Sequence, residues 1–272
     1  MSNIHVVAKE RHASKRWQRY SSYAHTAADA LAHLVLPELS RACVAMPVGF
    51  IKVKGKLAPV AIQGLEPGTN LLVSDDGRWL ADYIPAAYRS YPFALGATQA
   101  GEPVLCVRED SGLLSDSSGE PFFDEHGERA PILKEVLDFM IRVAAQRITT
   151  QRVCSLLQEH KLVQPWPFKR KTDEGEQIIE GLYRIDKTAL QQLSVEAFQQ
   201  VRLGGALPVV YCQLLSMQHL PKLHQLARAR TTQEALPLVS DGDLDLEFLN
   251  NEGTVSFGLI DQGLKHDREV YS

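Results

Sequence analysis

The sequence predicts an α+β fold, with an N-terminal antiparallel β-rich half and a C-terminal helical half with an inserted β-hairpin. Short apolar runs separated by glycine-containing turns predict hairpins between residues 46 and 108. From Pro131 onward, apolar residues recur at spacings of three and four, which is typical of helix. Further on, 207–217 is apolar almost all round and predicts a core helix.

The chain of 272 residues is long enough for one large domain or two small ones. We expect one compact domain composed of consecutive regions. These are an N-terminal segment at 1–45, a β-rich region at 46–130, a helical region at 131–230 with a hairpin at 168–186, and an acidic terminal hairpin or tail at 231–272.

Tandem hairpins are expected in the β-rich region, because Lys54-Gly55-Lys56 and Asp75-Asp76-Gly77 are tight-turn sequences between apolar runs. The strands are predicted at 50–53, 57–62, 70–73, 78–83 and 103–107. The stretch 109–130 has the composition of a loop. Upstream, 27–35 is predicted to be a short helix that Pro37 ends.

The helical region is predicted to begin at Pro131, because proline is favourable in a first helical turn. A second helix is expected at 151–161, with Thr150 as its N-cap. The hairpin turns at Asp173-Glu174-Gly175, and a strand returns over 178–185. Further helices are predicted at about 195–204 and 207–217, and strands of a terminal hairpin near 244–248 and 254–260.

Composition excludes several classes of function. The net charge of −4 is mild and gives no indication of a nucleic-acid binder. No apolar run is long enough to span a bilayer, and 1–20 lacks the apolar core of a signal peptide, so we expect a cytoplasmic protein. The cysteines form no CxxC motif and are interpreted as buried thiols in a reducing compartment: Cys43, Cys106, Cys154 and Cys212.

The N-terminal segment contains a patch in which basic and aromatic residues alternate. Its members are Lys9, Arg11, Lys15, Arg16, Arg19, Trp17, Tyr20 and Tyr23. Such a patch suits phosphates, an anionic membrane or an acidic protein surface. The alternative is a solvated, poorly ordered arm, and we favour the arm because no known binding motif accompanies the patch.

Catalytic and nucleotide-binding motifs such as GxGxxG, GxSxG and HExxH are absent from the sequence. A metal site would have to be assembled by folding, from His12 and His126 with a carboxylate such as Asp75 or Asp124. We therefore predict no metal and no cofactor.

The densest aromatic stretch is 75–93, with Arg89 at its centre. A guanidinium beside tyrosine rings can stack on a ring and still bind a carboxylate or phosphate. The alternative is an arginine that ties two loops through backbone carbonyls, with the aromatic side chains filling the core. The predicted binding residues are Arg89, Trp79, Tyr83, Tyr88 and Tyr91.

Several blocks of the sequence occur in a common order with a known family. They are LVLPELSRACVAMPVGFI (34–51), PVAIQGLEPGTNLLVSDDGRWLADYIPAAYRSYPFAL (59–95), VLCVRED (104–110), GEPFFDEHGERAPIL (119–133) and GLYRIDKTALQQL (181–193). With these blocks the chain resembles the bacterial SapC family, named for a surface-layer-associated protein. The family usually has two adjacent arginines where this chain has Arg89-Ser90, and Glu-Phe where it has Glu38-Leu39.

The resemblance implies a cytoplasmic accessory protein without assigned catalytic residues. Its gene context links the family to surface-layer protein production and type I secretion. Elsewhere the family is found beside halogenase-like, receptor and cupin-like genes.

We therefore expect an accessory protein that binds another protein and is not an enzyme. One alternative is an enzyme, metal-dependent and oxygenase-like or peptide-modifying, with its site near 79–93. A second alternative is a DNA-binding regulator that uses 150–186 as a winged helix, although few basic residues lie on its recognition helix.

Overall fold

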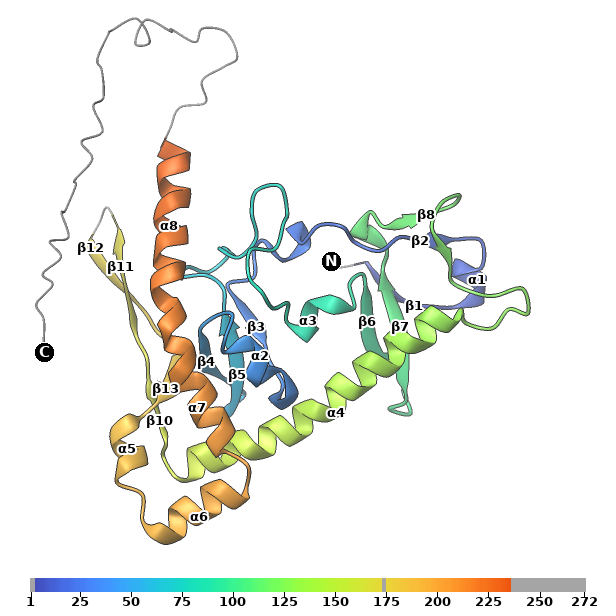
Figure 1. Ribbon diagram of the computed structural model, residues 1–272. Helices are drawn as coiled ribbons and strands as arrows, with labels where there is room; N and C mark the ends of the chain where they lie inside the picture. Colours follow the sequence, from blue (N-terminus) through green and yellow to red (C-terminus); the bar gives the residue numbers. More distant parts are fainter. Residues whose placement is uncertain (1–2, 173–174, 236–272) are drawn as a thin grey trace, which may run out of the picture. The chain divides into compact units, whose positions relative to one another are not determined.

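The computed structural model describes residues 3–172 and 175–235. The fold below is that of the first of the two units into which the chain divides, which ends at Thr231. The described residues form an α+β fold, with antiparallel sheets concentrated in the N-terminal half and helices toward the C-terminus (Figure 1). The terminal hairpin predicted within 231–272 lies outside the described residues.

The largest sheet has five antiparallel strands in the order β10-β13-β4-β5-β3. Its strands are β10 (Val163–Pro165), β13 (Leu182–Ile185), β4 (Val48–Val53), β5 (Lys56–Ile62) and β3 (Leu31–His33). The predicted hairpin is confirmed as β4–β5. Its turn places Lys54 at φ 50° and Gly55 at φ 79°. Both residues have a positive φ, as the two central residues of a type I′ hairpin turn must.

A second sheet has three strands in the order β1-β7-β6. They are β1 (Ile4–Val6), β7 (Pro103–Arg108) and β6 (Phe93–Ala97). The predicted strand at 103–107 is confirmed as the middle strand β7. Beside this sheet, the short strands β8 (Leu114–Ser115), β2 (Arg16–Trp17) and β9 (Glu120–Pro121) pair in that order.

The inserted hairpin consists of β11 (Phe168–Thr172) and β12 (Gly175–Ile179), which pair antiparallel. The prediction of one continuous return strand over 178–185 is wrong, because the chain forms two separate strands there, β12 and β13. Gly181 has a φ of 101°, and this left-handed residue redirects the chain from β12 into β13, which joins the large sheet instead.

The most prominent helix is α4 (Pro131–Glu159), which runs unbroken for 29 residues. The prediction of two helices meeting near Thr150 is therefore wrong. The Thr150 hydroxyl donates to the carbonyl of Gln146 (2.7 Å) and accepts from the Leu36 amide (3.0 Å), so it does not cap a helix start. Without a turn between two helices, the described residues of 150–186 do not form a winged helix.

Short helices and the C-terminal helices complete the fold: α1 (Lys9–His12), α2 (Leu39–Ala42), α3 (Ala86–Arg89), α5 (Lys187–Gln191), α6 (Val195–Leu203), α7 (Leu207–Ser216) and α8 (Leu220–Ala235). The helices predicted near 195–204 and 207–217 are confirmed. On α7, the Gln213 side chain donates to the Val48 carbonyl (3.2 Å) and accepts from the Ile185 amide (3.0 Å), which fastens the helix to the large sheet.

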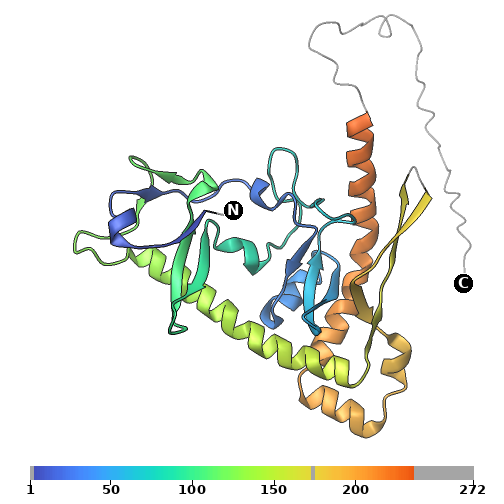
Figure 2. The ribbon, with the colours of Figure 1, turned by 180° about the vertical axis from the view of Figure 1, so that it is seen from behind.

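Two clusters of buried apolar side chains form the core of the described part of the chain. The larger one includes Phe50 and Leu57 from the five-stranded sheet, and the smaller one includes Leu105 and Phe122. Helix α4 contributes to both, since Leu133 and Met140 belong to the smaller cluster while Val153, Cys154 and Leu157 belong to the larger. Seen from either side, α4 extends from β6 and β7 at its start to β5 at its end (Figures 1 and 2).

Two further predictions of local structure are wrong. The second hairpin, expected at 70–83, is only an isolated bridge between Val73 and Trp79. The helix expected at 27–35 is replaced by the edge strand β3, whose neighbour is β5. In both places tertiary contacts override a weak local pattern.

The interpretation of the N-terminal segment as a solvated arm is also wrong for the described residues. Trp17 is only 3% exposed and belongs to the smaller core cluster. Three of its five basic side chains form ion pairs with the stretch 109–120: Arg11 with Glu109, Lys15 with Asp116 and Arg19 with Glu120. The patch therefore binds acidic groups of its own chain.

None of the helices in the described ranges has a stretch long and apolar enough to cross a membrane.

Candidate functional site

The aromatic side chains predicted at the site gather with others from the N-terminal segment. Tyr91 stacks on His25, with ring centroids 3.7 Å apart and planes 9° apart. The Trp79 ring lies 5.4 Å from that of Tyr23 and 5.9 Å from that of Tyr88. We call this group the ring cluster, made of Tyr20, Tyr23, His25, Trp79, Tyr88 and Tyr91.

Buried Glu38 fixes the segment around Tyr83 and Ala86, next to the ring cluster, through hydrogen bonds. Its side chain accepts hydrogen bonds from the Tyr83 hydroxyl (2.8 Å), the Ala86 amide (2.6 Å) and the Val35 amide (3.0 Å). Burial and the nearby Glu38 carboxylate raise the pKa of Tyr83. The predicted residue Tyr83 is thus an internal anchor at the start of α3.

A second set of buried hydrogen bonds fixes Tyr88. The Tyr88 hydroxyl donates to Oε1 of Gln63 (2.8 Å), which also accepts from Nδ2 of Asn70 (3.3 Å). Similarly, Nε1 of Trp79 donates to the Tyr83 carbonyl (2.9 Å). The polar ends of these aromatic residues are bonded inside the protein, so their ring positions are fixed before any ligand arrives.

The sequence left two interpretations of Arg89 open, and the structure contains elements of both. Its Nε and one terminal nitrogen donate to the carbonyl of Ile84 at 2.9 Å and 2.7 Å, and its guanidinium lies 5.0 Å from the centre of the Tyr83 ring. The side chain thus ties the loop to α3. It is nevertheless exposed, and it borders a hollow.

Residues of the ring cluster border two hollows, and Tyr91 borders both. The Arg89 hollow has a volume of about 340 Å³ and is bordered by Arg19, Tyr20, Tyr23 and Arg89 among others. Burial, with the neighbouring Tyr23, raises the pKa of Tyr20 to about 12, so its hydroxyl stays protonated at neutral pH.

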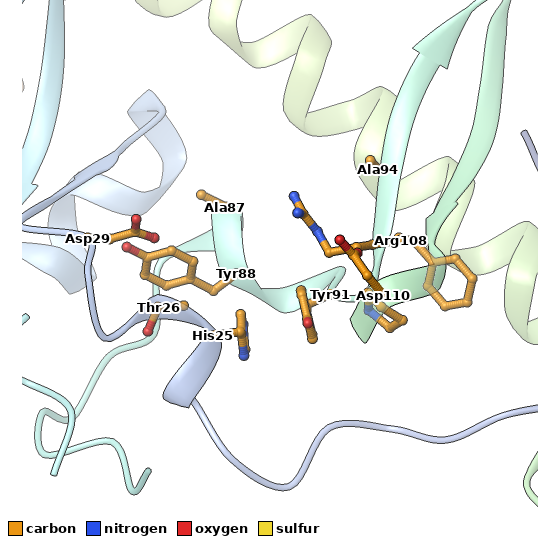
Figure 3. Close-up of a pocket in the computed structure, with 11 residues that line it drawn as sticks. His25, Thr26, Asp29, Ala87, Tyr88, Tyr91, Ala94, Arg108 and Asp110 are labelled. Carbon is orange, nitrogen blue, oxygen red and sulfur yellow. The ribbon is translucent and has the colours of Figure 1, made fainter. Parts of the chain in front are cut away.

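The Arg108 hollow is larger, with a volume of about 520 Å³. Figure 3 shows the rings of His25 and Tyr91 facing each other on one side, with the Asp29 carboxylate near the Tyr88 hydroxyl and the Arg108 guanidinium directed into the space. Burial lowers the pKa of His25, and the charge of Arg108 lowers it further, so His25 is neutral at neutral pH.

Sequence reasoning predicted part of this site and missed the rest. The predicted residues Trp79, Tyr88 and Tyr91 belong to the ring cluster. Tyr83 and Arg89 are not part of the cluster and contact each other instead. The missed residues are Tyr20, Tyr23, His25 and Arg108. The density of aromatic residues around Tyr20 was a signal for the first two, but nothing local marks Arg108, which reaches the site only through strand pairing.

The metal set considered from the sequence is not assembled. Nε2 of His12 lies 3.2 Å from Glu109, and Asp124 accepts from backbone amides of its own turn. Within the described ranges, the His, Cys, Asp and Glu side chains form no group of three or more that could hold a metal ion.

A family model described as SapC matches residues 7–223, which include both hollows and the whole ring cluster. The chain belongs to the SapC family. No curated protein and no solved structure matches it. The SapC resemblance noted in the sequence is therefore confirmed. Where the family usually has a second arginine, this SapC chain places Ser90 at the border of the Arg89 hollow.

Proposed function

We propose that this SapC-family protein is a cytoplasmic accessory protein that binds another protein through the ring cluster and its two hollows, without catalysing a reaction. The observation that carries the proposal is a fixed group of tyrosine, histidine and tryptophan rings with an arginine on either side. Tyrosine, tryptophan and arginine are the residue types that dominate the binding energy of protein interfaces.

Preorganisation supports the proposal. The rings are held by hydrogen bonds to Gln63 and to the Tyr83 carbonyl, so binding a partner would order few side chains. Rigid aromatic side chains give a large contact area at a low cost in conformational entropy. The link of SapC proteins to surface-layer production and type I secretion, implied by the resemblance, suggests that the partner belongs to such a process.

The test is affinity capture from native lysate with the tagged full-length protein. A site variant combines Arg89→Ala with Tyr91→Leu, and a matched control combines Arg142→Ala with Tyr211→Leu. Arg142 is exposed, and Tyr211 on α7 is 52% exposed and is not part of the ring cluster. We expect a defined partner with the wild type and the control, and its loss with the site variant.

Thermal unfolding of each variant shows whether the fold is retained. The proposal fails if the wild type captures no defined partner, or if a folded site variant captures it equally well. A catalytic role near 79–93 would be supported instead by conversion of a captured component in the presence of the wild type alone.

A further inference from the structure

Arg108 is a charged residue of the site whose guanidinium is not bonded to any other residue in the described part of the chain. It is the last residue of β7, and its side chain is half-buried at the border of the Arg108 hollow. Its backbone amide donates to the Pro92 carbonyl (3.0 Å), but no hydrogen bond or ion pair of its guanidinium to another described residue is found. Arg89 and Arg11, by contrast, are each bound to an oxygen of the protein.

An unpaired guanidinium that is partly removed from water is unfavourable unless an acceptor joins it. The hollow leaves room for one, because the small residues Ala87 and Ala94 lie at its border. Figure 3 shows the Arg108 guanidinium extending into this space between the two alanines. Its volume of about 520 Å³ lies within the range of small-ligand sites.

The charges around the hollow restrict the ligand. Asp29 lies beside the Tyr88 hydroxyl at the other end of the hollow, and Asp110 lies at the border near Arg108, where it accepts from the Asn3 amide (3.4 Å). A dianion such as phosphate would be repelled by both carboxylates and attracted only by Arg108. A monoanion that also carries an N–H donor suits both ends, the donor facing Asp29.

Several ring side chains border the hollow between its two ends. They are Tyr88, Tyr91 and neutral His25, together with Pro92 and Phe93. An apolar or aromatic body would lie against these rings while the polar groups of the ligand reach the two ends.

We propose that the Arg108 hollow binds a carboxylate whose body carries an apolar group and an N–H donor, as in the carboxyl-terminal residue of a polypeptide or a free N-acylated amino acid. The carboxylate would pair with the guanidinium fork of Arg108. This inference rests on the proposed function, because it names the group by which a partner protein would be held.

The probes are N-acetyl-L-phenylalanine and its neutral primary amide, which differ only in the carboxylate. Binding to the isotope-labelled full chain is followed by NMR titration. We expect the acid to shift the amide signals of Arg108, Tyr88 and Tyr91, and to bind roughly ten- to a hundred-fold more tightly than the amide. This comparison uses the wild type alone and does not depend on any variant folding.

Variants then assign the effect to the guanidinium. Arg108→Met keeps the apolar stem of the side chain and should reduce binding of the acid to the level of the amide. Arg108→Lys keeps the charge but loses the fork, and should bind the acid with intermediate affinity. The matched control Arg142→Met removes an exposed arginine of α4 and should bind like the wild type. Equal binding of acid and amide by the wild type, or full binding of the acid by folded Arg108→Met, would overturn the inference.

The two sources of the carboxylate are distinguished with a peptide that ends in phenylalanine, prepared with a free and with an amidated C-terminus. Tighter binding of the free peptide than of the acetylated amino acid supports a chain end as ligand, and the reverse order supports a small molecule. If a partner is captured but neither acid nor free peptide binds, this inference fails while the proposed function stands. If the acid binds and no partner is captured, the proposed function fails and the carboxylate site stands as that of a small molecule.

Discussion

At the scale of single residues, buried polar groups determine where the aromatic side chains lie. Glu38 is only 6% exposed, yet it is a carboxylate. Its oxygens compensate for burial by accepting from a tyrosine hydroxyl and two backbone amides. A sequence pattern reveals that 79–93 is aromatic, but it cannot reveal that Glu38 and Gln63, distant in the chain, hold those rings.

Replacing this carboxylate by an amide tests the role of Glu38. In Glu38→Gln one oxygen becomes an NH₂ group, which cannot accept from the donors that face it. We expect the free energy of unfolding to fall by about 1–3 kcal/mol, the cost of a buried donor left without a partner. Urea denaturation measures it, with exposed Glu135→Gln on α4 as the matched control. A loss no larger than that of the control would contradict this role.

A second residue-scale prediction concerns pH. The hydrogen bond from Arg11, with further help from the charges of Arg11, His5 and His12, lowers the pKa of Glu109 from 4.5 to about 2. Because the folded-state pKa is lowered, the contribution of Glu109 to stability is complete above pH 4.5 and is lost as the pH falls from there toward 2.

The comparison is between the wild type and Glu109→Gln, whose side chain does not titrate. Near pH 5.5 the wild type should be more stable by about 1 kcal/mol, since solvent screens a pair at the surface. The difference should shrink as the pH is lowered to 3, as measured by urea denaturation at each pH. Exposed Glu10→Gln on α1 serves as the control, and a difference that stays constant with pH would show that Glu109 does not titrate as expected.

At the scale of elements, the sequence predicted hairpins and helices with strong local patterns and failed where a side chain has a distant partner. The turn at Lys54-Gly55 is dictated locally, so β4 and β5 were found. Thr150 resembles an N-cap in sequence, but its partners are Gln146, one turn earlier, and Leu36, far along the chain. Only the folded structure shows that α4 continues through this residue.

The continuity of α4 leads to a prediction about Ala145, which is exposed between the parts of the helix that enter the two cores. Ala145→Gly should cost about 1 kcal/mol of unfolding free energy, and Ala145→Pro about 3 kcal/mol or more, because proline removes a hydrogen bond and clashes with the preceding turn. Urea denaturation monitored by circular dichroism measures both. Similar small losses for the two variants would indicate that the helix is already interrupted here.

At the scale of the whole described fold, the two core clusters share α4 and are joined by no other single element of comparable length. Sequence periodicity identified most of the apolar positions but could not assign them to one core or two. The assignment depends on which sheet each strand joins, and β3, β6 and β10 were not predicted as strands. The expectation of one compact domain therefore calls for a test of cooperativity.

Two buried cysteines can report on the two cores separately. Cys106 lies on β7 between two residues of the smaller cluster, and burial raises its pKa; Cys154 belongs to the larger cluster, and burial raises its pKa to about 12. Both thiols should resist iodoacetamide at pH 8 and become reactive over the same urea range, if the cores unfold together. Peptide mapping by mass spectrometry measures each site, and the fully denatured protein gives the reference rate. In the wild type, labelling of Cys106 at a clearly lower urea concentration than Cys154 would mean two independent domains. In Ala145→Pro, by contrast, we expect that separation, because the substitution weakens the helix that couples the cores.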